Sequence, residues 1–286
     1  MIHIISEIGC NHKGNLEIAK EMSKIAIIEC GIDIVKFQKR CPKELLTEEQ
    51  YNAPHPNPEN SYGITYGEHR EFLEFDILQH KELKGYIEKL GGVYSCSVWD
   101  MTSAREIISL NPKMIKIPSA CNLNFVLLEH IAKHYEGEIH ISMGMTKINE
   151  EVEIIKFFEK YNRLKDIVLY SCISGYPVNY DNLCLLDIFL KRKNYKKKIK
   201  AIGFSGHHVD ITADISAVTL GAEYIERHFT LDKNWKGTDH KASLEPKELK
   251  LLRDKIVEIE KALTFKPKDI LDCEIKQREK LKRVIR

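Results

Sequence analysis

Several features are missing from this 286-residue sequence, and each absence excludes a class of protein. It has no run of about 20 apolar residues, which a membrane-spanning helix needs. Its start, MIHIISEIGC, lacks the basic segment followed by an apolar one that marks a secretion signal. The net charge is only +2, from 44 Lys and Arg against 42 Asp and Glu, so no overall field attracts a polyanion. We expect a cytoplasmic protein with neither a membrane nor a nucleic acid as its partner.

Cofactor motifs are scarce as well. The eight cysteines form no CxxC pair and show no other metal-binding spacing, so we expect them to be small core residues in a reducing compartment. No GxGxxG follows a predicted strand, and a dinucleotide site therefore has no support. An anionic substrate has to be bound by a local cluster of charges.

Short runs rich in β-branched residues alternate with amphipathic segments, which is typical of parallel strands joined by crossover helices. Eight of each in strict alternation predict an α/β fold, a closed (β/α)8 TIM barrel, rather than an open sheet. The predicted strands are 2–6, 32–36, 92–96, 113–117, 138–142, 167–171, 200–203 and 223–227. The predicted helices are 15–29, 78–90, 101–109, 124–134, 149–161, 181–192, 210–220 and 246–263.

We assign the barrel to residues 1–264, with one long connection at about 39–77. A connection of this length is usually functional, so we expect a lid or a substrate-binding excursion, although a disordered insert is an alternative. Its aromatic residues favour packing over disorder. Residues 265–286 are mostly charged and are predicted to form a terminal helix or tail, either solvated or in contact with a partner subunit.

The active site of a TIM barrel forms at the carboxyl ends of its strands, and polar residues stand there repeatedly. His207 and His228 leave adjacent strands and could converge on a divalent cation that keeps positions open for water and substrate. His12 either adds to that site or orients Glu7. The polar strand-end residues are Glu7, Lys36, Gln38, Lys116, Ser119, Ser142, Ser205, His207, Glu226 and His228.

Lys36 and Lys116 end strands that are otherwise apolar, where an unpaired ammonium group is costly. Both therefore require an anion, and hydroxyl groups at the same rim would suit a small phosphate or carboxylate ligand. The hydroxyl groups belong to Ser119, Ser142 and Ser205. Alternatively each lysine forms a structural salt bridge, for which the candidate carboxylates are Glu7, Glu68 and Glu226.

Motifs that contain many of these residues extend along nearly the whole chain, and the ordered set is highly specific. The motifs are SEIGCNHKGNLEIAKEM, DIVKFQKR, TYGEHREFLEF, IKIPS, ISMGM, GYPV, GFSGHH and IERHFTLD followed by GTDHKASLEP. Together they resemble the sialic acid synthase family. That family condenses phosphoenolpyruvate with an N-acetylmannosamine-type aldose, which yields a nine-carbon 2-keto-3-deoxy sugar acid and phosphate.

The resemblance implies that His207 and His228 hold a catalytic divalent ion, usually Mn²⁺ with Mg²⁺ or Co²⁺ as alternatives, whose shell is completed by water and the sugar aldehyde. Glu7 matches the active-site glutamate, and Tyr176 and Asp239 match positions that contact the acceptor sugar. A homodimer is implied as well. The residues expected to embrace the phosphate and carboxylate of phosphoenolpyruvate are Lys36, Gln38, Lys116, Ser119, Ser142 and Ser205.

The chemistry of the condensation agrees with this inventory. Carbon 3 of phosphoenolpyruvate attacks the aldehyde, and a bound cation stabilises the negative charge that builds on the carbonyl oxygen. Water then attacks carbon 2, and phosphate leaves with cleavage of its C–O bond. We expect Glu7 to orient or deprotonate that water. Lys116 is expected to be a second catalytic residue beside Glu7. Asp239 is expected to hydrogen-bond the sugar hydroxyls and so to position the acceptor.

Three departures from the family pattern qualify these expectations. Cys121 stands where members commonly carry an acidic residue that helps bind the acceptor, and we interpret it as a space-filling residue rather than a nucleophile. Gly206 replaces an acid beside His207, although His208 could contribute to orienting it. The antifreeze-like domain of many members is expected to be missing, its contact either absent or made by another polypeptide. The alternatives are the same reaction on a different or phosphorylated aldose, or a catalytically silent barrel that binds a sugar acid.

Overall fold

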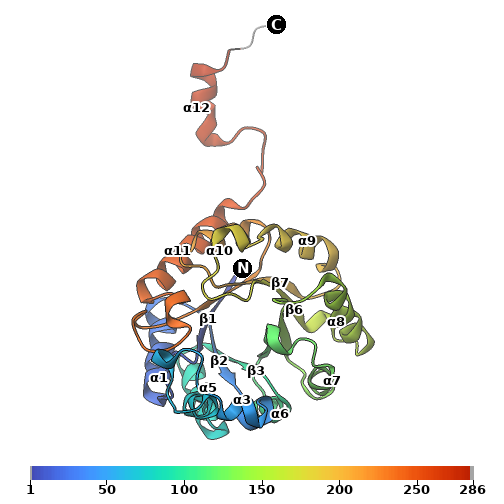
Figure 1. Cartoon of the computed structure of the whole chain (residues 1–286). Coiled ribbons are helices and arrows are strands. Elements are labelled where there is room, and N and C mark those ends of the chain that lie inside the picture. Colours follow the sequence, from blue (N-terminus) through green and yellow to red (C-terminus); the bar gives the residue numbers. More distant parts are fainter. Residues whose placement is uncertain (1, 284–286) are drawn as a thin grey trace.

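Eight parallel strands close into a barrel in their order along the chain, and helices surround it (Figure 1). This computed structural model describes residues 2–283. The architecture confirms the predicted (β/α)8 TIM barrel. The strands are β1 (His3–Gly9), β2 (Ile34–Lys39), β3 (Val93–Val98), β4 (Met114–Ile117), β5 (Glu138–Ser142), β6 (Ile167–Cys172), β7 (Ala201–Gly206) and β8 (Tyr224–His228).

The crossover helices begin where the sequence supplies a side chain that can accept hydrogen bonds from free backbone N–H groups. Asn15, Asp76, Asp100 and Asn124 each accept from an N–H group in the first turn of the helix they precede. The predicted helix 181–192 starts later than expected because residues 180–182 form a separate 3₁₀ turn. The helices are α1 (Leu16–Lys24), continued by the π-helical η1 (Ile25–Glu29), then α5 (Ile77–Lys89), α6 (Met101–Ser109), α7 (Phe125–His134), α8 (Ile148–Lys160), α9 (Leu186–Tyr195), α10 (Thr212–Thr219) and α11 (Pro246–Ala262).

Side chains alternate along each strand between the helix layer and the barrel interior. On β4, Ile115 and Ile117 join the main hydrophobic core beneath the helices, whereas Met114 and Lys116 face inward. The inward residues of the amino-terminal half of the barrel are largely apolar and form what we call the apolar plug. Its members are Ile5, Ile34, Met114, Val168, Tyr170, Ala201 and Tyr224.

Two residues further along several strands, the inward position becomes polar. Ile34 is followed in this way by Lys36, and Met114 by Lys116. The predicted strands on β1, β2 and β7 ended about three residues too early for this reason. Their hydrophobic runs stop where the interior turns polar, but the backbone hydrogen bonds of the sheet continue.

The long connection between β2 and α5, residues 40–76, folds into short helical elements, which supports the expectation that it packs. It contains α2 (Pro42–Leu45), α3 (Glu48–Asn52), η2 (Pro58–Asn60) and α4 (Tyr66–Leu73). The Tyr62 and Phe72 rings stack with their centroids 4.9 Å apart. Thr65 and Glu68 form a capping box at the start of α4. These contacts give the segment local structure although it shows little hydrophobic periodicity.

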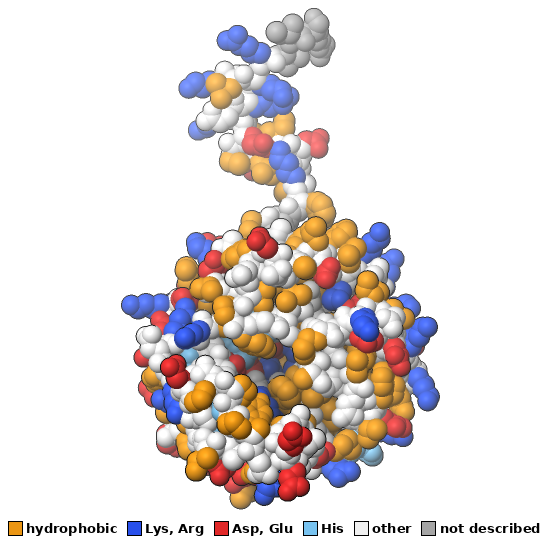
Figure 2. Space-filling view, in the orientation of Figure 1, with side chains coloured by type: hydrophobic (Ala, Val, Ile, Leu, Met, Phe, Trp, Pro, Cys, Tyr) orange, Lys and Arg blue, Asp and Glu red, His pale blue; other side chains and the backbone are white. Residues whose placement is uncertain are grey.

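The chain leaves the barrel after α11 and continues to α12 (Asp272–Leu281), which projects away from the other elements (Figures 1 and 2). Phe265, in the segment between the two helices, is 99% exposed. Of the region 265–286 predicted as a helix or tail, residues 284–286 lie outside the described residues. Within residues 2–283, every helix is too short or too polar to cross a membrane.

Candidate active site

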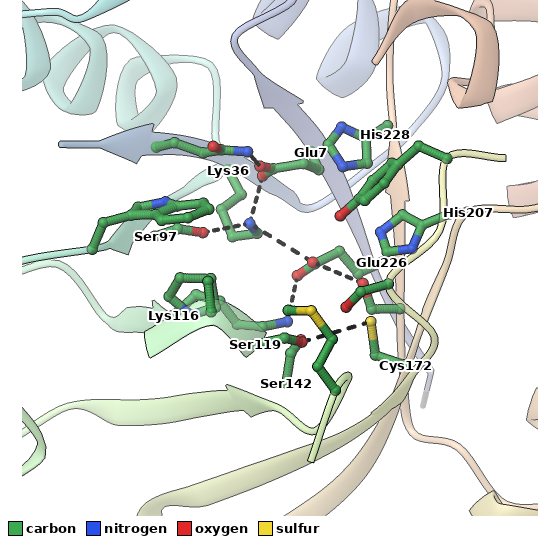
Figure 3. A pocket seen from close by; sticks show the side chains of 18 residues that line it. Glu7, Lys36, Ser97, Lys116, Ser119, Ser142, Cys172, His207, Glu226 and His228 are labelled. Atoms are coloured by element: carbon green, nitrogen blue, oxygen red, sulfur yellow. Dashed lines mark hydrogen bonds and ion pairs between the residues drawn. The ribbon is translucent and has the colours of Figure 1, made fainter. Parts of the chain in front are cut away.

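A cavity of about 270 Å³ opens at the carboxyl ends of the strands (Figures 2 and 3). All eight strands, or the residues that directly follow them, contribute to its wall. Most of the residues predicted from the sequence lie in it, which brings together side chains as far apart in the chain as Glu7 and His228. The lining residues are Glu7, Lys36, Gln38, Ser97, Trp99, Lys116, Pro118, Ser119, Ala120, Ser142, Met145, Cys172, Ser174, Tyr176, Ser205, His207, Glu226 and His228.

The polar lining is organised in layers, because alternate strands of a TIM barrel place their inward side chains at the same height. On the even-numbered strands, the inward-facing residues that stand two positions after the lowest residues of the apolar plug form one layer. This layer contains Lys36, Lys116 and Glu226, together with Tyr170, the uppermost member of the apolar plug. The odd strands supply the adjoining layer, which contains Glu7, Ser97, Ser142 and Ser205.

A buried cluster of charges joins these two layers (Figure 3). The Lys36 Nζ atom lies 2.6 Å from Glu7 Oε2 and 3.7 Å from Glu226 Oε1, and it donates to Ser97 Oγ at 2.8 Å. Lys116 Nζ lies 2.9 Å from Glu226 Oε2. The structure thus shows both lysines paired with carboxylates, as the alternative prediction proposed, and yet both ammonium groups line the cavity.

The charges of this cluster support one another despite burial. Burial alone would lower the pKa of Lys36, but the carboxylates of Glu226 and Glu7 outweigh it and raise that pKa. Burial lowers the pKa of Lys116; Glu226 opposes this shift, and the neighbouring ammonium group of Lys36 adds to it. Burial would raise the pKa of Glu226, but Lys116 and Lys36 hold it far below its usual range. Glu226 is therefore ionised, and its carboxylate helps to hold the ammonium groups of Lys36 and Lys116 in place.

Two neutral side chains fix the carboxylates of the cluster. Gln38 Nε2 donates to Glu7 Oε1 at 2.7 Å, and Ser205 Oγ donates to Glu226 Oε1 at 3.1 Å. Each carboxylate is thus held between a lysine and an uncharged donor. Such an arrangement restricts the rotation of Glu7 and directs its free lone pairs toward the cavity.

Below the cluster, a column of polar contacts supports Lys116 from the barrel interior. Its Nζ atom lies 3.4 Å from the centroid of the Tyr170 ring, a distance at which the ring quadrupole attracts a cation. The Tyr170 hydroxyl is 2.8 Å from His140 Nδ1, and His140 Nε2 is 3.4 Å from Glu138 Oε2. Gly203 leaves room for the tyrosine, since a Cβ atom there would lie 2.5 Å from the ring.

His207 and His228 lie on one side of the cavity with their ring centroids 5.6 Å apart. His207 Nδ1 is 2.9 Å from the carbonyl oxygen of Ile173, so the backbone accepts its proton and Nε2 remains available as a ligand. Burial, followed by the nearby His228, lowers the pKa of His207 to about 3. The imidazole is therefore neutral, as metal ligation requires.

The two residues expected to contact an acceptor sugar lie next to this pair. Tyr176 lines the cavity and stacks on His207 with the ring centroids 4.1 Å apart. Asp239 does not line the cavity; its Oδ2 atom lies 4.0 Å from His228 Nδ1, at the rim. The structure thus places Asp239 within reach of a ligand that extends out of the cavity past His228.

Ser119 and Ser142 occupy the side of the cavity opposite the first strand. Ser119 Oγ accepts a hydrogen bond from the Gly144 N–H group at 3.0 Å, which orients the hydroxyl. Gly144 is required at that point, because a Cβ atom would lie 2.7 Å from Ser119 Oγ. The two hydroxyls, with Lys116, form a wall that can donate several hydrogen bonds to one anion.

His12 does not join this site. Its ring stacks on Phe75 with the centroids 4.1 Å apart, and its Nδ1 atom accepts from the Gly14 N–H group at 3.1 Å. Burial, followed by the charge of Arg40, lowers the pKa of His12 to about 3. The lining of the cavity does not include it. His12 instead holds the loop after β1 against the long connection.

His208 points away from the cavity, so the expectation that it could orient His207 is wrong. Its Nε2 atom is 3.0 Å from Arg227 and 3.2 Å from Asp214 Oδ2. Arg227 also pairs with Asp214, and all three side chains are fully buried. Gly206 accommodates this cluster, since a Cβ atom there would lie 2.8 Å from the His208 ring. We refer to His208, Asp214 and Arg227 as the outer ion cluster.

Cys121 also lies outside the lining of the cavity, where Ala120 stands instead. Its Sγ atom faces the carbonyl oxygen of Trp99 at 3.1 Å, and the side chain belongs to the hydrophobic core. Burial, with a contribution from Asp100, raises the pKa of the Cys121 thiol to about 12. A thiol held in its protonated form is a poor nucleophile, which supports its interpretation as a space-filling residue.

Some functional positions were missed by the sequence analysis. Glu226 was predicted as a polar strand-end residue and as an alternative partner for the lysines, but it was given no role in the site, although it lies at the centre of the cluster. Ser97 and Cys172 each follow the last residue of a predicted strand, 92–96 and 167–171. Counting on by two residues from inward-facing Ser95 and Tyr170 would have placed both in the cavity.

Comparisons with known proteins agree with this geometry. A family model described as the NeuB family matches residues 24–268. N-acetylneuraminate-9-phosphate synthase of Homo sapiens is 37% identical over 280 residues, which cover 97% of this chain and 76% of the human protein. N,N'-diacetyllegionaminic acid synthase of Campylobacter jejuni is 35% identical over 261 residues, with 91% and 77% covered.

The fold is shared with solved structures. The N-acetylneuraminic acid synthetase of Leptospira borgpetersenii, crystallised in complex with citrate, has a TM-score of 0.83 and 26% sequence identity. The similarity covers 99% of this chain and 93% of that chain. The similarity thus includes the whole barrel.

Proposed function

The chain belongs to the NeuB family, and from this premise we propose that it condenses phosphoenolpyruvate with an N-acetylmannosamine-type aldose. As a member of this family it is an enzyme that joins phosphoenolpyruvate to a sugar. The product proposed is a sialic acid-like 2-keto-3-deoxy nonulosonic acid, released together with phosphate. One observation carries the proposal: Lys36 and Lys116 are buried and face one cavity beside His207 and His228.

Phosphoenolpyruvate fits the layer of lysines and hydroxyls. Its phosphate and carboxylate are both anionic, and charge-assisted hydrogen bonds to ammonium groups are about twice as strong as neutral ones. Lys36 and Lys116 approach the cavity from β2 and β4, so two cations can hold two anionic groups of one small molecule. Because Glu7 and Glu226 already order both lysines, less freedom is lost when substrate binds. The hydroxyls available around them are those of Ser97, Ser119, Ser142 and Ser205.

A divalent cation fits between the two histidines, and we propose Mn²⁺, with Mg²⁺ or Co²⁺ as alternatives. His228 Nδ1 is buried without a hydrogen-bond partner, and His207 keeps Nε2 free. Among residues 2–283, no third His, Cys, Asp or Glu joins them in a cluster suited to a metal, so water and substrate would complete the shell. When bound, the cation would stabilise negative charge on the aldehyde oxygen as a Lewis acid.

Glu7 is placed to handle the water that attacks carbon 2. Gln38 and Lys36 hold its two carboxylate oxygens, at 2.7 and 2.6 Å, so it can accept a proton from a water molecule without reorienting. Lys36 and Lys116 would stabilise the phosphate as its C–O bond breaks, because negative charge grows on the departing oxygen. Tyr176 and Asp239 would orient the acceptor sugar.

We also propose a homodimer in the cytoplasm. The family resemblance suggests the dimer, and apolar side chains exposed on the neighbouring helices α8 and α9 support it. They are Ile148 and Val152 of α8 and Leu186, Phe189 and Leu190 of α9. An apolar patch of this kind favours burial against another protein surface.

Phosphate release tests the proposed function directly. Purified protein with phosphoenolpyruvate, Mn²⁺ and N-acetylmannosamine or its 6-phosphate is expected to release phosphate and to form a product that contains the whole aldose plus pyruvate, as read by mass spectrometry. Acylated and unacylated mannose, altrose and gulose complete the panel of acceptors. Reactions without an aldose provide the control for simple hydrolysis. Absence of aldose-dependent release across the panel would support a catalytically silent barrel instead.

Removing the ring beneath Lys116 should weaken binding of phosphoenolpyruvate. Tyr170→Leu is expected to raise the KM for phosphoenolpyruvate roughly 30-fold, because a desolvated cation–π contact contributes about 2 kcal/mol. Tyr170→Phe keeps the ring and should change this KM by less than about threefold. Steady-state kinetics over a range of phosphoenolpyruvate concentrations measure both. Equal KM values for the two variants would show that the ring does not position Lys116.

A further inference from the structure

Two lysines near the cavity mouth lie against aromatic rings rather than carboxylates. Lys13, in the loop after β1, has its Nζ atom 3.7 Å from the ring centroid of Trp235. Lys236, in the loop after β8, has its Nζ atom 5.0 Å from the ring centroid of Tyr62. Neither lysine forms an ion pair with any described residue. A cation held on a ring keeps its charge uncompensated, and an anionic ligand can therefore use it.

Arg70 of α4 shows the same pattern. Its Nε atom donates to the Tyr66 hydroxyl at 2.9 Å, and its guanidinium lies 5.0 Å from the Tyr66 ring centroid. Across residues 2–283 it has no carboxylate partner either. Arg40, by contrast, is paired with Glu74 at 3.1 Å. Lys13, Arg70 and Lys236 thus differ from the structural cations around them, and we call these three residues the rim cations.

The loops that carry the rim cations are packed against one another. The Tyr62 hydroxyl donates to the carbonyl oxygen of Lys236 at 2.6 Å, which joins the long connection to the loop after β8. Gly14 joins the loop after β1 to the same connection, because a Cβ atom there would lie 2.3 Å from the carbonyl oxygen of Phe72. Phe72 in turn stacks on Tyr62. The three cations therefore belong to one continuous part of the rim.

This part of the rim adjoins Asp239, which lies 4.0 Å from His228. Asp239 follows Lys236 in the same loop after β8, and its Oδ1 atom accepts a hydrogen bond from Thr238 Oγ1 at 3.0 Å. The loop that carries Lys236 thus also carries the carboxylate that is expected to bind sugar hydroxyls. From the cavity outward, the site thus presents the imidazole of His228, the carboxylate of Asp239 and then the rim cations.

His69 lies within the same group of charges. Burial lowers its pKa to about 4, and His55, Arg70, Arg40 and Lys236 contribute in that order. Arg70 and Lys236, which come from different loops, therefore both act on one buried side chain. The His69 ring also lies 6.0 Å from the Tyr62 ring, which holds Lys236, and 6.0 Å from the Tyr66 ring, which holds Arg70, so the two cations lie on the same side of the mouth.

We propose that Lys13, Arg70 and Lys236 form a subsite for the terminal phosphate of a phosphorylated acceptor sugar. The subsite rests on the proposed function, because its position is defined relative to the aldehyde end of the acceptor. An extended aldose with its aldehyde beside the histidines and its hydroxyls at Asp239 directs its last carbon toward the rim cations. A phosphate dianion there would meet several cationic donors that have no other anion to bind.

Carbon counting identifies the position of that phosphate. Phosphoenolpyruvate adds three carbons to the aldehyde end, so position 6 of a six-carbon aldose becomes position 9 of the product. The relatives from Homo sapiens, Mus musculus and Drosophila melanogaster are named N-acetylneuraminate-9-phosphate synthases. A preference of this chain for an aldose 6-phosphate would agree with the placement of the rim cations.

Kinetics with matched acceptors test the subsite. For the unaltered enzyme, kcat/KM for N-acetylmannosamine 6-phosphate is expected to exceed that for N-acetylmannosamine by at least tenfold. The combined variant Lys13→Met, Arg70→Met and Lys236→Met should lower kcat/KM for the phosphorylated sugar by on the order of 100-fold, because charge-assisted hydrogen bonds are lost. Its kcat/KM for the free sugar should stay within about twofold, which also reports that the variant is folded.

Lys147→Met provides the matched control. Lys147 is exposed and follows β5, on the opposite side of the barrel, and its loss should leave the ratio of the two kcat/KM values unchanged. A combined variant that slows both acceptors equally, or an unaltered enzyme that favours the free sugar, overturns the subsite.

Calorimetric titration with N-acetylmannosamine 6-phosphate separates the subsite from the proposed reaction. Binding that disappears in the combined variant supports the subsite even if neither sugar supports phosphate release, a result that would contradict the proposed function alone. Binding that is equally strong in both proteins overturns the subsite whatever the activity.

Discussion

Replacing His228 with alanine should lower kcat/KM by at least about 1,000-fold. The substitution removes one of only two imidazoles proposed to hold the cation, and the charge stabilisation supplied by such a cation is worth several kcal/mol in the transition state. His228 ends β8 and is buried beside the cavity, so alanine shortens a side chain without breaking the sheet. Phosphate release measured across Mn²⁺ concentrations checks the expectation.

Two further measurements make this prediction specific. Titration of the variant with Mn²⁺, followed by the electron paramagnetic resonance of the free ion, should show weaker binding than in the unaltered protein. His134→Ala, at the end of α7, serves as the matched control and should retain full activity. A His228→Ala enzyme that still turns over at a tenth of the normal rate would remove His228 from its assigned role.

Replacing Arg227 with methionine should lower the free energy of unfolding by about 3–5 kcal/mol, because it leaves Asp214 buried without its cationic partner. Arg227 is fully buried and also donates to the carbonyl oxygens of Asp210 at 2.7 Å and His208 at 2.6 Å. Those acceptors would lose their donor as well. Denaturant unfolding followed by circular dichroism measures the change.

An exposed ion pair offers the control for this substitution. Arg253→Met removes the partner of Asp254, with which Arg253 forms a half-exposed pair at 3.0 Å, and should cost less than about 1 kcal/mol. Adding Asp214→Leu to Arg227→Met should recover part of the lost stability, since no unpaired charge is left in the interior. Similar losses for the Arg227 and Arg253 variants would show that the outer ion cluster is not a buried determinant of stability.

The sequence was informative wherever a hydrophobic pattern has one physical interpretation. Runs such as 113–117 and 138–142 coincide closely with β4 and β5, because both strands are short and apolar on their outer side. Eight such runs in alternation with helices leave few alternatives to a closed barrel. The same assignment of strands placed Lys36, Lys116, His207 and His228 at one end of the barrel.

What the sequence could not predict is which polar groups meet. Glu226 lies 110 positions from Lys116, and the pairing between them follows from strand register and barrel closure, neither of which is local. His207 and His208 have the same side-chain chemistry, yet one lines the cavity and the other joins the outer ion cluster. Both directly follow β7, and the two consecutive side chains point in different directions.

The apolar plug closes the barrel beneath the lysine layer, so the cavity resembles a cup with a floor. Both substrates must then enter through the mouth, and one of them lies deeper in the cavity than the other. Phosphoenolpyruvate, bound at the level of Lys36 and Lys116, would have to arrive before the sugar, whose position next to His228 and Asp239 covers it. The order of the two binding events would thus be imposed by the depth at which each strand carries its polar residue.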